Sequence, residues 1–269
     1  MSTSVPFVVS ESGRHYPIES APAEHSDLVR VYVWEWPVRL AHWGVVLSIA
    51  VLAVTGIYIG NPSITVTGPA GDHFLTGTMK VVHFYAAILF TLAVLSRLIW
   101  MFRGNHFARW DKFLPVKRRR RRGLVQALRF YLFQLRKPPG FIGHNPLAGA
   151  TYTLVFLIYL VMILTGFTLY GASANVDSHM RVFGRLVPLF GGLQTVRLIH
   201  HAGMWLLIGF AIHHVYSAVL MSQIEANGTT ESIFSGYKFV HKDDVIYSGY
   251  RYIDPKDIHE QHLEPVRKR

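Results

Sequence analysis

Apolar residues along this chain gather in four blocks, at about residues 40–60, 81–102, 152–170 and 199–221, and polar residues fill the segments between them. None of the four blocks contains an acidic residue. Each is close to the ~20 residues that an α-helix needs to cross the ~30 Å hydrocarbon core of a membrane. The pattern therefore predicts an all-α integral membrane protein, built as a bundle of four transmembrane helices.

The same pattern divides the chain into three parts. We expect a polar N-terminal arm over residues 1–37, a four-helix membrane domain over 38–223 and a polar C-terminal tail over 224–269. The first apolar block begins near Leu40, too late and too long for a cleaved signal peptide, so it is expected to remain as the first span. In the arm, the aromatic run 31–36 is typical of an anchor at the membrane interface.

Charge predicts the orientation of the four helices. The net charge is +11, and twelve lysines and arginines lie between Arg103 and Lys137, in the loop 103–150 that joins the second and third blocks. The connection 61–78 has none. By the positive-inside rule the basic loop is cytoplasmic and both termini are cytoplasmic as well, which indicates a multi-pass protein of the cell inner membrane.

The basic loop also carries a helical pattern. Leucines between residues 124 and 135 recur at helical spacing among arginines, which is typical of an amphipathic helix on the inner membrane surface, here ended by Pro138. A helix that covers the end of the bundle fits the same pattern. For the basic run 117–122, contact with anionic lipid headgroups is the simpler interpretation and nucleic-acid binding the less favoured one.

The chain contains no cysteine. This excludes disulfides, iron–sulfur clusters held by the chain's own cysteines, and haem attached covalently at a Cys-x-x-Cys-His site. Any haem that this protein binds is therefore expected to be haem b, held without a covalent bond to the chain.

Two histidine pairs, His200-His201 and His213-His214, lie inside the fourth apolar block. A histidine in a membrane span is costly unless it has a function. His200 and His214 are 14 residues apart, and a helix places them about 40° from alignment and about 21 Å apart along its axis. Every other combination misses alignment by about 120–140°. His200 and His214 therefore share one face, and His201 and His213 are interpreted as helix-packing or supporting groups.

Two further histidines match these two in depth. On the predicted topology, His83 lies near the outer end of the second helix, level with His200, and His42 lies near the inner end of the first helix, level with His214. Two imidazoles at each of two levels are typical of two six-coordinate b haems that transfer electrons. We predict these four histidines as the axial ligands of the haem irons. A hydrogen-bonded structural role for each histidine is the alternative.

Cations precede three of these four histidines by three residues, namely Arg39, Lys80 and Arg197. Residues at this spacing lie on one helix face, so the three cations are candidate partners for anionic haem propionates. Long cationic side chains at the ends of spans also extend to lipid headgroups without any such role, and this alternative stays open.

Several motifs resemble the b-type cytochrome subunit of membrane-bound nickel–iron hydrogenases. The first helix carries RLAHW (39–43) and LAVTG (52–56), and the fourth carries RLIHH (197–201) followed by Met204, Trp205, Phe210 and His214. GHNPLA (143–148), Gly104-Asn105 with Ala108-Arg109, and SGY (235–237) are also similar to that family. The resemblance covers about residues 32–239. Lys80 stands where the family leads us to expect arginine, and Leu198 where it leads us to expect a small residue.

The resemblance implies a di-haem, four-helix cytochrome that anchors the hydrogenase small and large subunits on the periplasmic side. It implies that electrons pass from the small-subunit iron–sulfur clusters through two b haems to quinone, with His42, His83, His200 and His214 as ligands. Such a chain does no hydrogen chemistry itself, since it has no cysteine to hold nickel. It would be the electron-transfer subunit of a hydrogen:quinone oxidoreductase and is expected to carry the site of quinone reduction.

Quinone reduction requires a hydrogen-bonding pocket at membrane depth. Polar residues at the inner ends of the second and third helices are candidates to bind quinone, namely Asn105, His106, Arg109, His144 and Asn145. For each of them, capping of a loop or contact with headgroups is the alternative interpretation.

Three other functions remain to be weighed against this one. The closest is the cytochrome b membrane subunit of a formate dehydrogenase or thiosulfate reductase, against which the hydrogenase-like motifs argue. A membrane di-iron hydroxylase is less favoured, because such enzymes gather many histidines on the cytoplasmic side, whereas the histidines here are predicted at two levels. A structural anchor without haem would leave the histidines in the spans unexplained.

Overall fold

The computed structural model of this protein describes residues 7–10, 15–20, 28–63, 74–136, 138–241 and 250–252. Within them, four helices are long and apolar enough to cross a membrane: α1 (Trp36–Gly60), α2 (Leu75–Arg103), α4 (Pro146–Ser173) and α6 (Leu193–Glu225). Each contains one of the four apolar blocks and extends beyond it at one or both ends. The four predicted spans are therefore confirmed as helices.

The described residues fall into two compact units. The helical unit consists of Leu40–Ile99 and Thr153–Val215, and it contains most of each long helix. The sheet-containing unit draws its residues from Met1–Arg39, Trp100–Tyr152 and Tyr216–Arg269, and it contains one end of each long helix.

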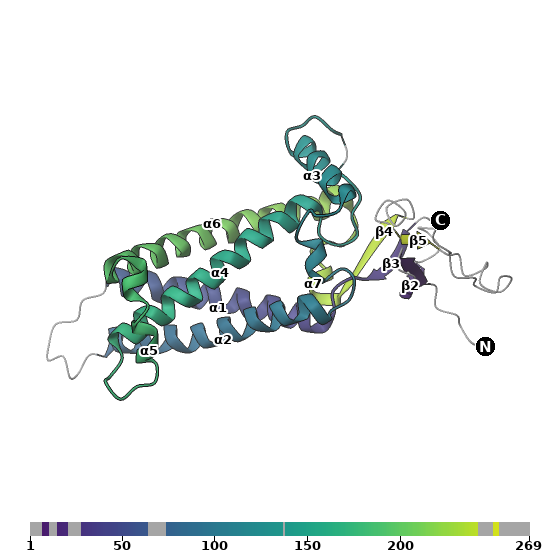
Figure 1. The fold of residues 1–269 in the computed structure, drawn as a ribbon. Coiled ribbons are helices and arrows are strands. Elements are labelled where there is room, and N and C mark those ends of the chain that lie inside the picture. Colours follow the sequence, from purple (N-terminus) through teal and green to yellow (C-terminus); the bar gives the residue numbers. More distant parts are fainter. Residues whose placement is uncertain are drawn as a thin grey trace, which may run out of the picture. The chain divides into compact units, whose positions relative to one another are not determined.

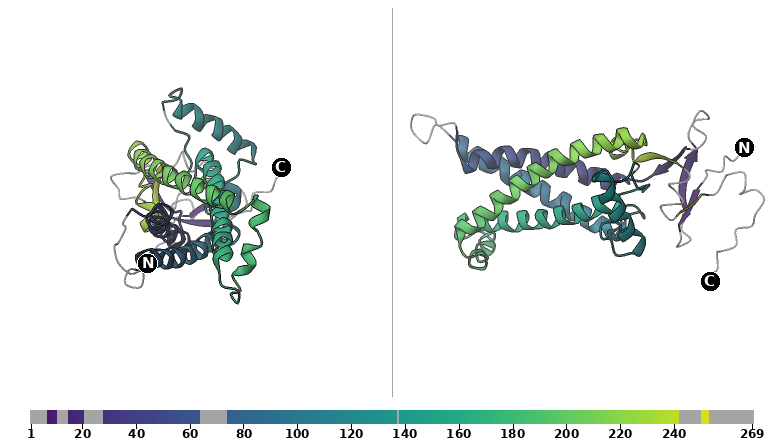
Figure 2. Two further views of the ribbon diagram at one scale, coloured as in Figure 1. Left: turned by 90° about the vertical axis from the view of Figure 1, so that its left-hand side faces the viewer. Right: turned by 90° about the horizontal axis from the view of Figure 1, so that it is seen from above.

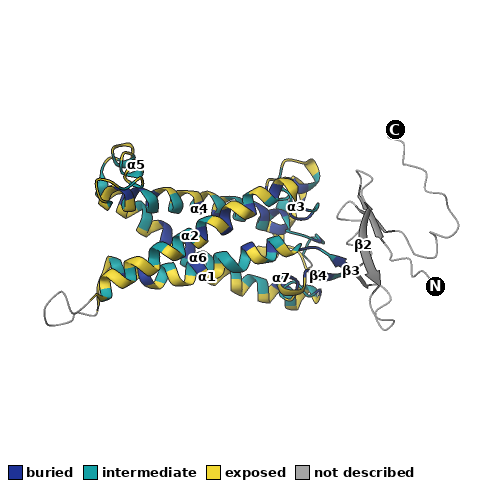
Figure 3. Cartoon of the chain, turned by 90° about the horizontal axis from the view of Figure 1, so that it is seen from below, coloured by how far each residue is buried: buried dark blue, intermediate teal, exposed yellow. Residues whose placement is uncertain are grey.

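In the helical unit, the four long helices run alongside one another (Figures 1 and 2). They share a core of buried side chains: Phe90 and Val94 of α2, Val155 and Tyr159 of α4, and Leu207 of α6. Many large apolar side chains outside this core are exposed along the helices (Figure 3). Exposed apolar surface on this scale is stable against lipid hydrocarbon rather than water, so the helical unit is that of a multi-pass membrane protein. The connection between α4 and α6 forms α5 (Arg181–Gly184) and the 3-10 turn η4 (Val187–Phe190).

The sheet-containing unit holds a five-stranded antiparallel sheet in the order β4-β3-β2-β1-β5. Its strands are β1 (Phe7–Ser10), β2 (His15–Ser20), β3 (Leu28–Tyr32), β4 (Tyr237–His241) and β5 (Tyr250–Tyr252). Strands β3 and β4 pair from Leu28 opposite His241 to Tyr32 opposite Tyr237. The N-terminal arm and the C-terminal tail are thus joined in one sheet.

This sheet corrects the all-α prediction, because the protein is mostly helical but not entirely so. The strands are only three to six residues long, and β4 and β5 come from the opposite end of the chain to β1, β2 and β3. Pairing between distant short segments is decided by their partners, so the local sequence pattern did not predict it.

The aromatic run 31–36, expected at the membrane interface, lies mostly in the core of the sheet-containing unit. Val31, Val33 and Trp34 are buried together with residues from the loop and the tail. The Trp34 indole donates a hydrogen bond of 3.1 Å to the Ser232 hydroxyl in the short helix α7 (Ser232–Ser235). Within the run, Trp36 is the most exposed, at 63%, and for this side chain the interfacial position stays a prediction.

The basic loop forms the 3-10 turn η3 (Trp110–Lys112) and the helix α3 (Arg118–Tyr131). The helix ends earlier than Pro138, and Phe133 just after it has a left-handed backbone with φ 59°. The apolar side chains of Val125 and Leu128 are exposed on α3, as an amphipathic helix at a membrane surface requires.

One arginine of the basic run, Arg120, is buried, unlike its neighbours in the run. It donates hydrogen bonds to the backbone carbonyl of Lys112 and, at 3.3 Å, to that of His144. Its guanidinium also lies 5.7 Å from the ring centre of Phe141. The loop is therefore folded around a single buried arginine, and the other cations of the run stay at the surface.

Glu35 fixes the start of α1 through both its carboxylate and its backbone carbonyl. One of its oxygens, Oε2, accepts hydrogen bonds of 2.7 Å from the Trp100 indole and of 2.7 Å from the backbone N–H of Asn105. The Glu35 carbonyl accepts bonds from the N–H groups of Val38 and Arg39, at 3.0 and 3.2 Å. Glu35 thus joins the start of α1 to the end of α2 inside the sheet-containing unit.

We expect Glu35→Ala to lower the free energy of unfolding of the detergent-solubilised protein by about 3–6 kcal/mol, because the carboxylate accepts two hydrogen bonds and each bond to a charged group contributes about 1.5–3 kcal/mol. Glu35→Gln keeps an acceptor oxygen without the charge and should cost less than half as much. Denaturation followed by tryptophan fluorescence measures both. Equal stability of Glu35→Ala and the unsubstituted protein would contradict this role for Glu35.

Candidate functional site

The four histidines predicted as haem ligands lie on three helices of the helical unit: His42 on α1, His83 on α2, and His200 and His214 on α6. All four are half-buried. Their neighbours on α6, His201 and His213, are exposed. The structure therefore separates each histidine pair into an inward and an outward residue, the same division that the helical spacing predicts.

His42 and His214, which we call the inner pair after their predicted level, have ring centres 6.4 Å apart with planes at 59°. Two imidazoles that bind one metal ion from opposite sides, each with a nitrogen about 2 Å from it, have ring centres about 6 Å apart. Phe210 stacks on His214 at 5.5 Å and 13°. The donor type and the spacing of this pair fit the two axial positions of a haem iron.

His83 and His200 are called the outer pair after their predicted level, and each ring is held by a threonine from another helix. Thr55 Oγ1 of α1 lies 2.8 Å from Nδ1 of His83, and Thr165 Oγ1 of α4 lies 2.8 Å from Nδ1 of His200. Because the threonines occupy Nδ1, both rings keep Nε2 as the nitrogen that a metal could bind. Sequence analysis did not predict either threonine.

Glycines follow both threonines and make room for the two rings. A Cβ on Gly56 would lie 3.3 Å from Cε1 of His83 and 3.6 Å from the sulfur of Met204, one turn beyond His200 on α6. A Cβ on Gly166 would lie 3.2 Å from Cε1 of His200. The structure thus places His83 at the level of the first turns of α6, where His200 lies.

The His201 ring contacts the backbone of its own helix and that of α1. Its Nδ1 lies 3.1 Å from the backbone carbonyl of Arg197, to which it donates. A Cβ on Gly60 of α1 would lie only 2.4 Å from its Nε2, so the ring rests directly on α1.

The three cations proposed near haem propionates differ in their surroundings. Lys80 and Arg197 are exposed, which is compatible both with propionate contact and with contact to headgroups. Arg39 belongs to the sheet-containing unit, where it donates a hydrogen bond to the backbone carbonyl of Phe234. Its Nε is buried and has no hydrogen-bond partner among the described residues.

Two of the five quinone candidates have loop-capping contacts. Asn105 accepts hydrogen bonds from the N–H groups of Phe107 and Ala108, at 3.1 and 3.0 Å, and donates to the Val33 carbonyl. Asn145 accepts a bond of 2.8 Å from the N–H of Ala148. This is the N-cap of α4, whose first residue is a proline, as is common at helix starts.

The other three candidates also lie in the sheet-containing unit. The His144 ring packs against aromatic rings, with its centre 4.7 Å from that of Trp34 and 4.8 Å from that of Tyr152. Burial, together with the neighbouring Lys112 ammonium, lowers the pKa of His106 to about 4, so its ring is neutral at pH 7. Arg109 has a buried Nε with no hydrogen-bond partner among the described residues.

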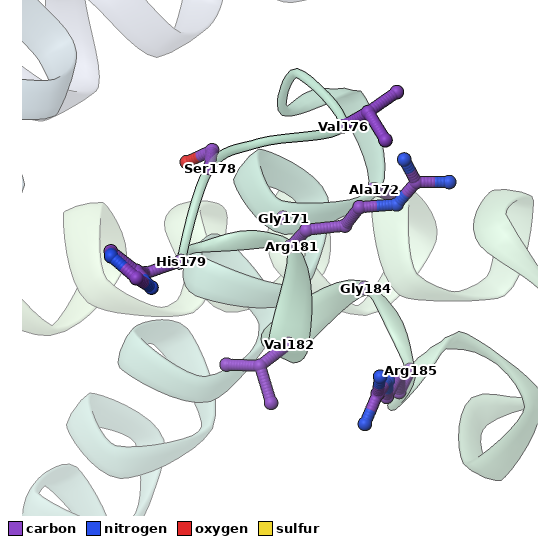
Figure 4. A pocket seen from close by; sticks show the side chains of 9 residues that line it. All are labelled: Gly171, Ala172, Val176, Ser178, His179, Arg181, Val182, Gly184 and Arg185. Atoms are coloured by element: carbon purple, nitrogen blue, oxygen red, sulfur yellow. The ribbon is translucent and has the colours of Figure 1, made fainter.

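A hollow in the helical unit is lined by the end of α4 and by the connection to α6. Its lining includes His179, Arg181 and Arg185. Figure 4 shows these three side chains leaving the connection in different directions, so they do not converge on one ligand position. The hollow does not form part of the histidine site.

Comparison with known proteins identifies relatives over most of the chain. The sequence model of the family described as "Prokaryotic cytochrome b561" matches residues 33–236. A Cupriavidus necator protein named "Probable Ni/Fe-hydrogenase B-type cytochrome subunit" is 40% identical over 223 residues, which cover 82% of this chain and 91% of the relative. A relative of the same name from Azotobacter vinelandii is 41% identical over 217 residues, covering 80% of this chain and 90% of the relative.

A more distant relative from Escherichia coli, "Probable Ni/Fe-hydrogenase 1 B-type cytochrome subunit", is 36% identical over 217 residues and is covered to 92%. The matched region, residues 33–236, includes all four long helices and the four histidines predicted as haem ligands. The chain therefore belongs to the prokaryotic cytochrome b561 family.

Proposed function

We propose that this protein is the membrane anchor and electron-transfer subunit of an uptake nickel–iron hydrogenase, and that it delivers electrons from hydrogen oxidation to quinone. The observation that carries the proposal is the pair of His42 and His214, whose spacing fits a haem iron, in a chain whose relatives are named hydrogenase cytochrome subunits. The three relatives described above are all named as B-type cytochrome subunits of a Ni/Fe-hydrogenase, which favours a hydrogenase over a formate dehydrogenase or thiosulfate reductase. Membership of a cytochrome family disfavours the di-iron hydroxylase.

Two b haems would be held at two levels, one by His83 and His200 and the other by His42 and His214. When bound, a haem would supply a one-electron iron couple for electron transfer. The protein's part is to hold the imidazoles of His83 and His200 through Nδ1, which leaves Nε2 available. Arg39, Lys80 and Arg197 are proposed to neutralise propionates.

The proposed orientation places the basic loop and both termini in the cytoplasm, following the positive-inside rule. The domain boundaries 1–37, 38–223 and 224–269 are retained as part of this proposal, with the arm and tail on the cytoplasmic side. The hydrogenase small and large subunits would then bind on the periplasmic side, near His83 and His200. Asn105, His106, Arg109, His144 and Asn145, at the inner ends of α2 and α4, remain the proposed quinone contacts.

The first test is the haem content of the purified full chain. We expect two low-spin b haems per chain, because the proposal assigns one pair of imidazoles to each. Pyridine haemochrome assay and low-temperature visible spectra measure the number and spin state. A spectrum without haem, from protein that is folded by circular dichroism, would overturn the proposed function.

The second test compares two adjacent histidines of α6. His214→Ala is expected to remove one of the two haems, since it deletes an axial ligand of the inner pair. His213→Ala is the matched control, because this side chain is next in sequence but exposed, and it should keep both haems. Equal haem loss in the two variants would refute the assignment of faces on α6.

The third test concerns the path to quinone. In the complex with its hydrogenase partners, His42→Ala is expected to lower the rate of hydrogen-dependent quinone reduction at least tenfold, while the partners still copurify. Hydrogen-dependent reduction of a soluble dye by the same preparation controls for an intact hydrogenase. Persisting quinone reduction would show that the inner pair is not on the path.

A further inference from the structure

The same two-residue arrangement occurs twice in the helical unit. Thr55-Gly56 on α1 holds the ring of His83, and Thr165-Gly166 on α4 holds the ring of His200. In both cases the threonine oxygen lies 2.8 Å from Nδ1, and the glycine leaves the ring edge without a neighbouring Cβ. Both threonines are buried, with side chains less than 5% exposed.

The hydrogen atoms of this arrangement can be assigned. Thr55 Oγ1 lies 2.7 Å from the Val51 carbonyl, and Thr165 Oγ1 lies 2.7 Å from the Val161 carbonyl. A carbonyl only accepts, and a hydroxyl has one hydrogen to donate. The threonine oxygen is then left to accept from the ring, so Nδ1 carries the hydrogen and Nε2 carries the lone pair.

The glycines complete the arrangement by fixing where the ring lies. An added Cβ at Gly56 or Gly166 would stand 3.3 or 3.2 Å from Cε1 of the ring, tighter than an ordinary carbon–carbon contact. The threonine hydroxyl and the glycine that follows it thus meet two adjacent atoms of the ring, Nδ1 and Cε1, along the same ring edge.

We propose that Thr55 and Thr165 are positioning residues that fix His83 and His200 in the Nδ1–H form, with Nε2 presented as a metal ligand. The inference rests on the proposed function, since it assumes that these two histidines bind a haem iron. Supporting hydrogen bonds of this kind orient a ligating imidazole and increase its basicity. A more basic imidazole stabilises ferric over ferrous iron, so the two threonines should lower the reduction potential of the outer haem.

The experiment uses the full-length protein in detergent and removes one hydroxyl at a time. Thr55→Val and Thr165→Val delete the hydroxyl at nearly constant volume, and Thr55→Ser and Thr165→Ser restore it. Thr168→Val is the matched control on α4, because Thr168 is equally buried and its hydroxyl bonds the Leu164 carbonyl of its own helix. Ser48→Ala is the control on α1, where the buried hydroxyl bonds the Gly44 carbonyl.

Two readouts separate positioning from packing: the midpoint potential of each haem and the low-spin electron paramagnetic resonance signal. In each valine variant, the midpoint potential of one haem should rise and its electron paramagnetic resonance signal should change. The potential and signal of the other haem should stay constant. A tenfold change in the preference for ferric iron corresponds to about 59 mV for one electron. The serine variants and both controls should titrate like the unsubstituted protein.

Each outcome of this experiment either supports or overturns the positioning role of Thr55 and Thr165. Haem loss in the valine variants with retention in the serine variants supports the proposal as well, because second-sphere partners commonly contribute 10–100-fold to metal affinity. Unchanged potentials and signals in both valine variants overturn it, as does equal disturbance by valine and serine, or by Thr168→Val. If the unsubstituted protein binds no haem, the proposed function itself fails, which is a different result from unresponsive threonines in a haem protein.

Discussion

An imidazole ring among apolar helices has two nitrogens, and each needs a partner because an unpaired buried polar group costs about 1–3 kcal/mol. The helical unit is arranged around this requirement. At the outer pair, the hydroxyls of Thr55 and Thr165 lie 2.8 Å from Nδ1 of His83 and His200. On the proposed assignment, Nε2 is satisfied by the haem iron. Protein and cofactor then divide the two nitrogens of each ring, and neither alone satisfies both.

The two levels of the bundle differ in how this requirement is met. At the inner level, the rings of His42 and His214 are 6.4 Å apart, Phe210 stacks on His214, and Nδ1 of His42 has no hydrogen-bond partner among the described residues. Hydrogen bonds around a ligating imidazole change its basicity, and burial changes the local dielectric. The two proposed sites therefore have the same ligand type but different surroundings. Differences in hydrogen bonding and burial around the ligands are how a protein gives two haems unequal reduction potentials.

The sequence predicts those features that local spacing determines. The four helices follow from the length of the apolar blocks, and the different exposure of His200 and His201 follows from helical periodicity. The Thr55–His83 contact was missed because a threonine in an apolar helix ordinarily bonds its own carbonyls, and nothing local connects it with a histidine 28 residues away. The threonine–glycine pair present in both α1 and α4 was the available signal. The burial of Arg120 was likewise hidden, since it is one of five consecutive arginines.

The threonine contacts also give a reason why the bundle contains α4, which carries none of the four proposed ligands. Thr165 of α4 holds His200 of α6, and Val155 and Tyr159 of α4 fill the common core. Helix α1 contributes a proposed ligand near one end, His42, and a supporting hydroxyl near the other, Thr55. A bundle of only α1, α2 and α6 would keep every proposed ligand, but His200 would lose the partner of its Nδ1. Each ligand of the outer pair is held by a hydroxyl from another helix. Helix α1 supplies this hydroxyl to His83 only, so α4 is needed to supply one to His200.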